Sequence, residues 1–145
     1  MKVIIDNNIF LDSFLPNREH KPVSDIVLAE CKGYGLVSVS SLTDIYYFLN
    51  KELGSERAKI IIRKIITNYD IIDSTKADAL AALDLPTNDF EDALVAVCAI
   101  KASADIIVSR DKKFRKMNCG ISVITPEDFL RSILADKRTP LNPKR

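Results

Sequence analysis

The chain has 145 residues, of which 47% are hydrophobic and 28% charged, with a mean hydropathy of +0.03. This length and balance are typical of one globular domain with a sizeable core, and they exclude a disordered or fibrous protein. A formal net charge of +1 excludes a global basic field, so local patches would have to bind any nucleic acid.

The cysteine and histidine counts exclude several kinds of site. Three cysteines without a C-x-x-C spacing indicate neither a disulfide framework nor a zinc site, and a single histidine excludes multi-histidine metal centres. The longest apolar run, residues 93–100, is too short to span a bilayer. Because Asp6 interrupts the first apolar run, a signal peptide is not predicted. We therefore expect a cytoplasmic protein that contacts no membrane.

The first half of the chain alternates between strand and helix patterns. A strand is predicted at residues 2–5, and Pro22 suits the first turn of a helix that ends before Gly33. A second strand at residues 36–39 is followed by a helix that Gly54 ends. The strand runs are continuously apolar, which is typical of strands covered on both faces.

The second half continues the alternation. Ser55 opens a helix, a long helical segment covers residues 90–103, and Pro126 opens the last helix. The remaining predicted strands are residues 69–72, 105–108 and 121–124. This order predicts a three-layer α/β/α fold with a central, mostly parallel sheet of about five strands.

The long helical segment carries apolar residues at helical spacing, which predicts one buried stripe. Its members are Phe90, Ala93, Leu94, Val97 and Ile100. Residues 1–135 are interpreted as a single domain. Residues 136–145 contain two prolines and excess positive charge, and they are predicted to be a flexible basic tail.

Four aspartates occupy ends of the predicted elements. Asp6 ends the first strand, Asp44 lies in the first turn of the helix after the second strand, Asp92 lies near the start of helix 90–103, and Asp111 follows the fourth strand. Strand ends and the starts of the following helices share one edge of a parallel sheet, so we expect these carboxylates to meet. Mg²⁺ or Mn²⁺ would compensate their repulsion and activate water for phosphodiester hydrolysis.

Each acid also has an explanation without function. A carboxylate in a first helical turn is favoured by the helix dipole, which accounts for Asp44 or for the group Asp89, Glu91 and Asp92. Asp6 can belong to a turn at the end of a strand, and Asp111 can start a helix. The metal hypothesis therefore depends on all four positions lying at one edge.

Residues 109–116 hold five basic residues against one acid, directly beside Asp111. Such a run is usually a solvated turn, but beside a metal cluster it suits a polyanionic substrate. Arg110, Lys112 and Lys113 are the predicted substrate-binding residues.

Two segments resemble PIN-domain nucleases. The first is "VIIDNNIFLDSF", in which a strand ends in Asp-x-Asn before an apolar helix. The second is "FEDALVAVCAIKASADIIVSRDKKF", and "SSLTDIYYFL" adds a weaker match between them. The resemblance covers most of residues 1–125 and implies a metal-dependent ribonuclease similar to the VapC-type toxins of toxin–antitoxin pairs.

The resemblance also implies roles for individual residues. The acidic quartet would be Asp6, Asp44, Asp92 and Asp111, with Asp6, Asp92 and Asp111 as metal ligands. Asn8 and Ser109 would orient these ligands, and Asp89 is an extra acid that can share the helix face of Asp92. Two positions depart from the family pattern, because Asp44 stands for the usual glutamate and Lys113 stands where many relatives carry an aspartate.

The implied partners are RNA, an antitoxin protein and a second copy of the chain. Two alternatives stay open: a PIN-like module that binds RNA or protein without cutting it, and a phosphotransfer or phosphatase domain with Asp6 as the nucleophile. The second alternative usually needs an aspartate where this chain has Asn8.

Overall fold

The structure is a computed structural model that describes residues 1–138, and it contains one five-stranded sheet in the order β3-β2-β1-β4-β5. Every pairing is parallel, so the predicted parallel α/β/α fold is confirmed. Each strand begins and ends within one residue of its predicted position. The strands are β1 Val3–Ile5, β2 Gly35–Ser38, β3 Asp70–Ile72, β4 Ile106–Val108 and β5 Ser122–Ile124.

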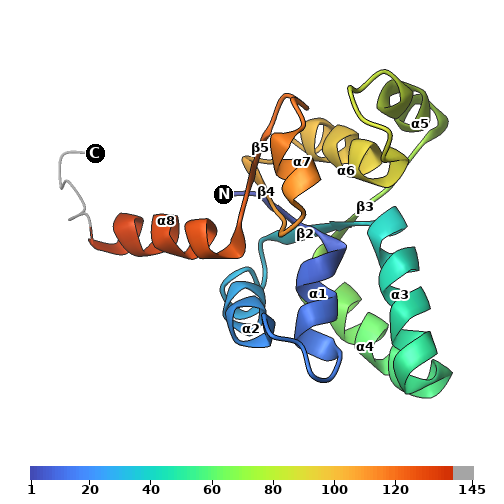
Figure 1. The fold of residues 1–145 in the computed structure, drawn as a ribbon, viewed down its shortest axis with the longest axis vertical. Coiled ribbons are helices and arrows are strands. Elements are labelled where there is room, and N and C mark those ends of the chain that lie inside the picture. The colour runs from blue at the N-terminus through green and yellow to red at the C-terminus, as the bar shows by residue number, and fades with distance from the viewer. Residues whose placement is uncertain (139–145) are drawn as a thin grey trace.

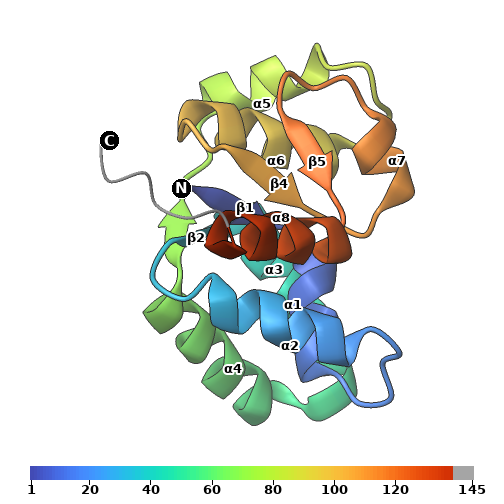
Figure 2. The ribbon, with the colours of Figure 1, turned by 90° about the vertical axis from the view of Figure 1, so that its left-hand side faces the viewer.

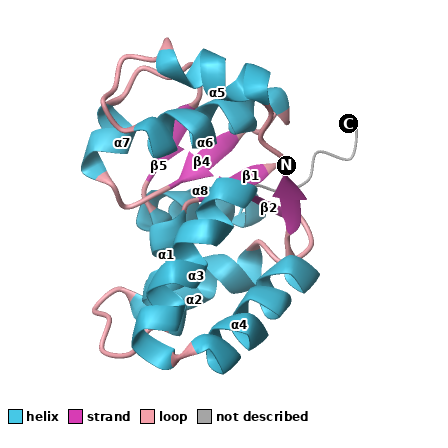
Figure 3. Cartoon of the chain, turned by 90° about the vertical axis from the view of Figure 1, so that its right-hand side faces the viewer, coloured by secondary structure: helices cyan, strands magenta, loops and turns pink. Residues whose placement is uncertain are grey.

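Helices cover both faces of this sheet, as Figures 1, 2 and 3 show from three sides. Helices α1 to α4 pack on one face, α6 and α7 pack on the other, and α5 packs on α6. Helix α8 extends away from the sheet beside α2 (Figure 1). The helices are α1 Asn7–Phe14, α2 Lys21–Glu30, α3 Val39–Leu53, α4 Ser55–Asn68, α5 Lys76–Leu83, α6 Phe90–Lys101, α7 Lys112–Lys116 and α8 Pro126–Arg138.

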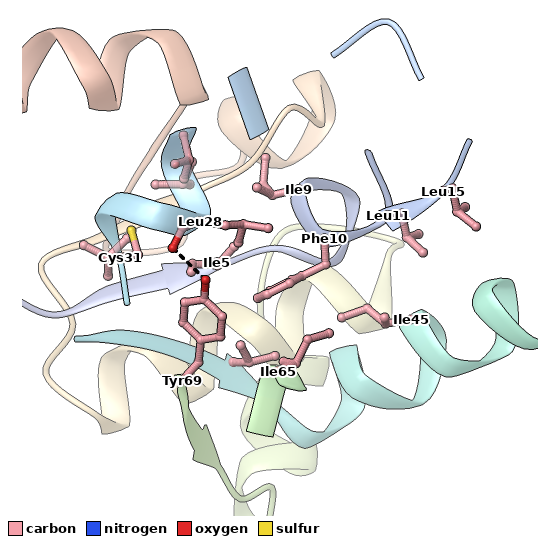
Figure 4. Close-up of a cluster of buried hydrophobic side chains, with 14 of the residues drawn as sticks. Ile5, Ile9, Phe10, Leu11, Leu15, Leu28, Cys31, Ile45, Ile65 and Tyr69 are labelled. Atoms are coloured by element: carbon pink, nitrogen blue, oxygen red, sulfur yellow. Dashed lines mark hydrogen bonds between the residues drawn. The ribbon is translucent and has the colours of Figure 1, made fainter. Parts of the chain in front are cut away.

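The strands are apolar throughout because both of their faces are buried. In β1, Val3 and Ile5 contact the cluster under α1 to α4, whereas Ile4 contacts the cluster under α6 and α7. In the first cluster the hydroxyl of Tyr69 donates a 2.6 Å hydrogen bond to the carbonyl of Leu28 (Figure 4). The buried strands therefore hold the edge of the sheet rigidly in place.

One glycine is required by this packing. A Cβ atom on Gly35 would lie 2.9 Å from Cδ1 of Ile5 and 2.9 Å from Cδ1 of Tyr69. Such distances are shorter than a normal van der Waals contact, so β2 can approach β1 and Tyr69 only with glycine at this position.

The predicted helix ends are largely confirmed, with one correction. Pro22 lies in the first turn of α2, and Gly54 ends α3 with a φ of +88°. Helix α3, however, begins at Val39, because the side chain of Ser38 caps it by accepting a 3.1 Å hydrogen bond from the Ser41 N–H. Asp44 therefore lies in the second turn of α3, and its predicted place in the first turn is wrong.

The predicted stripe of α6 is also wrong at its ends. The side chains of Phe90 and Ile100 are 46% and 51% exposed. Between them α6 is buried on several sides, since the sheet contacts Val95 and Ala96 while α5 contacts Ala93. The small side chains of Ala93 and Ala96 let α6 lie close to both α5 and the sheet, so its buried residues do not form a single stripe.

The C-terminal helix overlaps the predicted tail. Helix α8 continues to Arg138, so residues 136–138 are helical, and residues 139–145 lie outside the described residues. Phe129 is fully buried against the core, and Lys137 lies 3.5 Å from Glu30 of α2. Among the helices that the structure describes, none is long and apolar enough to cross a membrane.

Candidate active site

The candidate site lies where the connections of the sheet change direction. From the central pair β1 and β4, the chain continues to β2 on one side and to β5 on the other. Asp6 directly follows β1, and Ser109 directly follows β4. In open α/β sheets the crevice beyond the strand ends at this point is the usual place for a ligand.

Asp6 is held by hydrogen bonds from three neighbours. Its Oδ1 accepts a 2.9 Å bond from the backbone N–H of Asn7 and thereby caps α1. Its Oδ2 accepts a 2.6 Å bond from the Ser109 hydroxyl and a 3.2 Å bond from the Asn8 amide. The side chains of Asn8 and Ser109 therefore orient this carboxylate, which is 2% exposed.

The pKa of Asp6 is raised from 3.8 to about 6, mainly because burial disfavours the charged carboxylate. The hydrogen bonds from Ser109 and Asn7 oppose this shift, while the negative charges of Asp111 and Asp89 add to it. Asp6 therefore shares an electrostatic environment with acids from distant parts of the chain.

Three further acids form a compact group beside Asp6. Carboxylate oxygens of Asp89, Asp92 and Asp111 lie within 4.8 Å of one another. Asp89 caps α6 by accepting a 3.0 Å bond from the Asp92 N–H, and Asp111 caps α7 by accepting a 2.9 Å bond from the Lys113 N–H. A capping carboxylate uses one oxygen for its helix and can offer the other to a cation.

Asp92 shows the strongest effect of this crowding. It is 8% exposed, and its pKa is raised from 3.8 to about 8. Burial is the main cause, followed by the negative charges of Asp6, Asp89 and Asp111. A carboxyl group in these surroundings binds a proton at neutral pH unless a cation replaces it.

Asp44 is connected to this site by Glu91, a residue for which the sequence predicts no role. The carboxyl group of Asp44 lies close enough to that of Glu91 to raise its pKa, and Glu91 also accepts a 2.7 Å hydrogen bond from the Asn7 amide. Burial and the proximity of Asp44 hold the pKa of Glu91 well above its usual range. The structure therefore places Asp44 at the edge of the site, in contact with an acid of α6.

The donor set of the group suits a hard divalent cation. Asp89, Asp92 and Asp111 offer carboxylate oxygens, which Mg²⁺ and Mn²⁺ prefer as ligands. The raised pKa of Asp92 indicates that the described protein groups leave negative charge uncompensated there. Asp89 therefore joins two of the predicted ligands, Asp92 and Asp111, in one group, and Asp6 as a ligand stays a prediction.

The predicted substrate-binding residues separate into two groups. Lys112 and Lys113 are exposed at the start of α7. Arg110, by contrast, forms an ion pair with Asp12, a buried acid of α1. This pairing holds the guanidinium against α1, so the structure does not favour Arg110 as a substrate contact.

Two residues with clear contacts were missed from the sequence. Glu91 carries only the signal that it precedes Asp92 at the start of α6. Asp12 was recognisable only as an acid inside the otherwise apolar segment "NIFLDSF". In both cases the direction of the side chain, which depends on the rotation of the helix, decides the role.

Comparison with known proteins identifies the family. A family model described as a PIN domain matches residues 2–113. Ribonuclease VapC1 of Aquifex aeolicus (strain VF5) is 32% identical over 136 residues, which cover 88% of this chain and 92% of the relative.

Solved structures agree on the fold. VapC20 of Mycobacterium tuberculosis, a sarcin-ricin loop cleaving toxin, has a TM-score of 0.67 and 14% identity over 78% of this chain and 92% of its own. A toxin–antitoxin complex from Klebsiella pneumoniae has a TM-score of 0.66 and 17% identity over 86% of this chain and 98% of the matched chain. The chain therefore belongs to the PIN domain family, as its two sequence segments predict.

Proposed function

We propose that this protein is a ribonuclease that depends on a divalent metal ion. The observation that carries the proposal is the group of Asp89, Asp92 and Asp111 beside Asp6, at the switch point of a PIN-family sheet. A relative that is 32% identical over most of both chains bears the name ribonuclease, which supports the same reaction class.

Asp6, Asp92 and Asp111 are the proposed metal ligands, and Asp89 joins them because of its distance to the last two. A bound Mg²⁺ or Mn²⁺ ion would neutralise the phosphate and lower the pKa of a water molecule. Asn8 and Ser109 keep the Asp6 carboxylate in one orientation. Asp44 acts through its proximity to Glu91, in the proposed role of the usual family glutamate.

RNA reaches this group past the exposed ammonium groups of Lys112 and Lys113. Both lie beside Asp111, so they attract the phosphate backbone toward the carboxylates without neutralising the cluster itself. Arg110 is left out of this role because Asp12 binds it.

The proposal is tested by incubating the purified protein with a panel of RNAs in Mn²⁺, in Mg²⁺ and in a chelator. Cleavage is expected only with metal, and Asp6→Asn and Asp92→Asn are expected to abolish it, because each removes a negative charge from the cluster. Asp70→Asn is the matched control, since Asp70 is exposed and begins β3, at the end of the parallel strands opposite to Asp6 and Ser109.

Cleavage by the Asp92→Asn protein at the parental rate would contradict the mechanism. Binding of RNA without cleavage, by a protein that shows no site for Mn²⁺ in calorimetry, would instead identify a module that only binds. Trapping of an acyl phosphate on Asp6 would identify the phosphotransfer alternative.

Two partners are proposed, an antitoxin protein and a second copy of the chain, with the cytoplasm as the place of action. The fold shared with a toxin–antitoxin complex supports the first. Tyr47 and Phe48 of α3 and Ile60 of α4 are 59%, 40% and 66% exposed, which supports a protein contact on these helices. Light scattering of the purified protein measures its mass, and a monomer would exclude the homodimer.

A further inference from the structure

A pocket of about 520 Å³ opens directly beside the acidic group, and the proposed function assigns it no ligand. Its walls are formed by the loop before α6, the first residue of α6 and the start of α7. Volumes of this size are typical of sites for small organic groups. The lining residues are Thr87, Asn88, Asp89, Phe90 and Lys113.

One wall of this pocket is an aromatic ring that the fold leaves uncovered. Phe90 is 46% exposed although its spacing on α6 predicts burial, and it lies between Asp89 and the acids of the first helical turn. An exposed aromatic face at the entrance of a site is a surface on which a nucleobase can stack, because every base has a π-face.

The other walls carry polar groups that suit the rest of a nucleotide. Lys113 brings an ammonium group for a phosphate, and Asn88 brings an amide that can both donate to and accept from a base edge. The loop that carries Asn88 is stabilised by a hydrogen bond, since the Asp89 N–H donates to the Thr87 hydroxyl at 3.0 Å.

The position of the pocket fixes its relation to the proposed reaction. Asp89 lines the pocket and also lies within 4.8 Å of the carboxylates of Asp92 and Asp111. A group bound in the pocket is therefore a neighbour of whatever the acidic group binds. In a single-stranded RNA, the unit next to the reacting phosphate is one nucleoside.

We propose that this pocket binds one unpaired nucleobase of the RNA, stacked on Phe90 next to the scissile phosphate, with Lys113 on the adjoining phosphate. This inference rests on the proposed ribonuclease function and adds a subsite to it. Phe90 is then a positioning residue that selects single-stranded RNA, because a paired base cannot leave its helix to enter the pocket without losing its partner.

The test is the binding of a short fluorescein-labelled single-stranded RNA, measured by anisotropy in the Asp92→Asn background, which keeps the RNA intact. Phe90→Ala is expected to raise Kd about ten-fold, because one stacked base is lost. An abasic RNA backbone of the same length should bind the two proteins equally. Phe90→Trp should restore tight binding, and Leu134→Ala is the control for loss of an exposed apolar side chain, since Leu134 is 52% exposed on α8.

Cleavage by the chain without Asp92→Asn separates this proposal from the proposed function. Parental cleavage combined with no effect of Phe90→Ala on Kd or KM would overturn the subsite alone. RNA binding that depends on Phe90, without cleavage by the parent, would overturn the ribonuclease and keep the subsite. Equal weakening of intact and abasic RNA, or no binding of RNA at all, would also overturn the subsite, and a pocket that binds a protein segment would then be the better explanation.

Discussion

At the scale of single residues, the ion pair between Arg110 and Asp12 links the candidate site to α1. Asp12 is 3% exposed and has a second cationic neighbour in Arg18, at 3.8 Å. Arg110 immediately precedes Asp111, so its pairing fixes the backbone that carries one of the proposed ligands. A buried carboxylate that loses its main cation retains the full penalty of its desolvation.

We therefore expect Arg110→Ala to lower the free energy of unfolding by about 3 kcal/mol. Urea denaturation measures this change, and Lys116→Ala, at an exposed position of α7, should leave stability unchanged. Replacing Asp12 by Ala in the Arg110→Ala protein should recover part of the loss. An Arg110→Ala protein of parental stability with weakened RNA affinity would return Arg110 to the substrate-binding role that the sequence suggests.

Single residues also show what the sequence could and could not predict. Asp6 and Ser109 were recognisable because each follows a continuously apolar strand, and parallel strands place their ends at one edge. The ion pair of Arg110 was not, because Arg110 belongs to the basic run 109–116 and its partner Asp12 is distant in the chain. The sequence lists the charges of a segment but does not state the direction in which each side chain points.

At the scale of elements, the start of α6 holds both the residue that caps the helix and two of the proposed metal ligands. Asp89 caps the helix, and Glu91 and Asp92 occupy its first turn. The partial positive charge of a helix N-terminus stabilises such acids, so the functionless explanation of these residues is also physically valid. The capping role and the proposed metal-binding role are compatible. The cap uses Oδ1 of Asp89, while the acidic group depends on the negative charge that the carboxylate still carries.

Two substitutions of Asp89 separate these effects. Asp89→Asn keeps an oxygen for the cap, so stability should change little, whereas Asp89→Ala should cost about 1 kcal/mol. Both should weaken Mn²⁺ binding, because both remove the charge. Thermal unfolding and calorimetric titration measure the two quantities. Parental Mn²⁺ affinity in the Asp89→Asn protein would show that Asp89 is a cap and not a ligand.

The strands and most helix ends were predictable because their signals are local, such as Pro22 at the start of α2 and Gly54 after α3. The burial of α6 was not predictable in the same way. The burial of its Ala93 depends on where α5 packs, and the residues of α5 form no apolar stripe that would predict a helix. Which residues of α6 are buried therefore depends on both helices and cannot be predicted from the pattern of α6 alone.

At the scale of the whole molecule, the buried acids of the site make the free energy of unfolding depend on pH and on the proposed metal ion. The folded chain holds protons on Asp92 up to a pKa of about 8 and on Asp6 up to about 6, whereas an unfolded chain releases both near 3.8. The folded state therefore binds more protons than the unfolded state between these values. These two shifts lower stability as pH rises from about 4 to about 8, and the raised pKa of Glu91 extends the fall to about pH 9.

In a chelator, the melting temperature is thus expected to fall between pH 6 and pH 8 as these two groups lose their protons. Mn²⁺ should stabilise the protein more at pH 8 than at pH 6, because the ion then competes with fewer protons. Circular dichroism at several pH values measures both effects, and Asp92→Asn should flatten the dependence. A melting temperature that is insensitive to pH and Mn²⁺ would contradict the shared electrostatic environment.

The central place of β1 in the sheet has a consequence for biosynthesis. β1 is synthesised before its neighbour β4, which is more than one hundred residues away in the sequence. A nascent chain that carries Asp6 but not yet Ser109 and Asp111 has no complete cluster. The proposed ribonuclease would therefore become active only after β4, Ser109 and Asp111 have been synthesised and have packed beside β1.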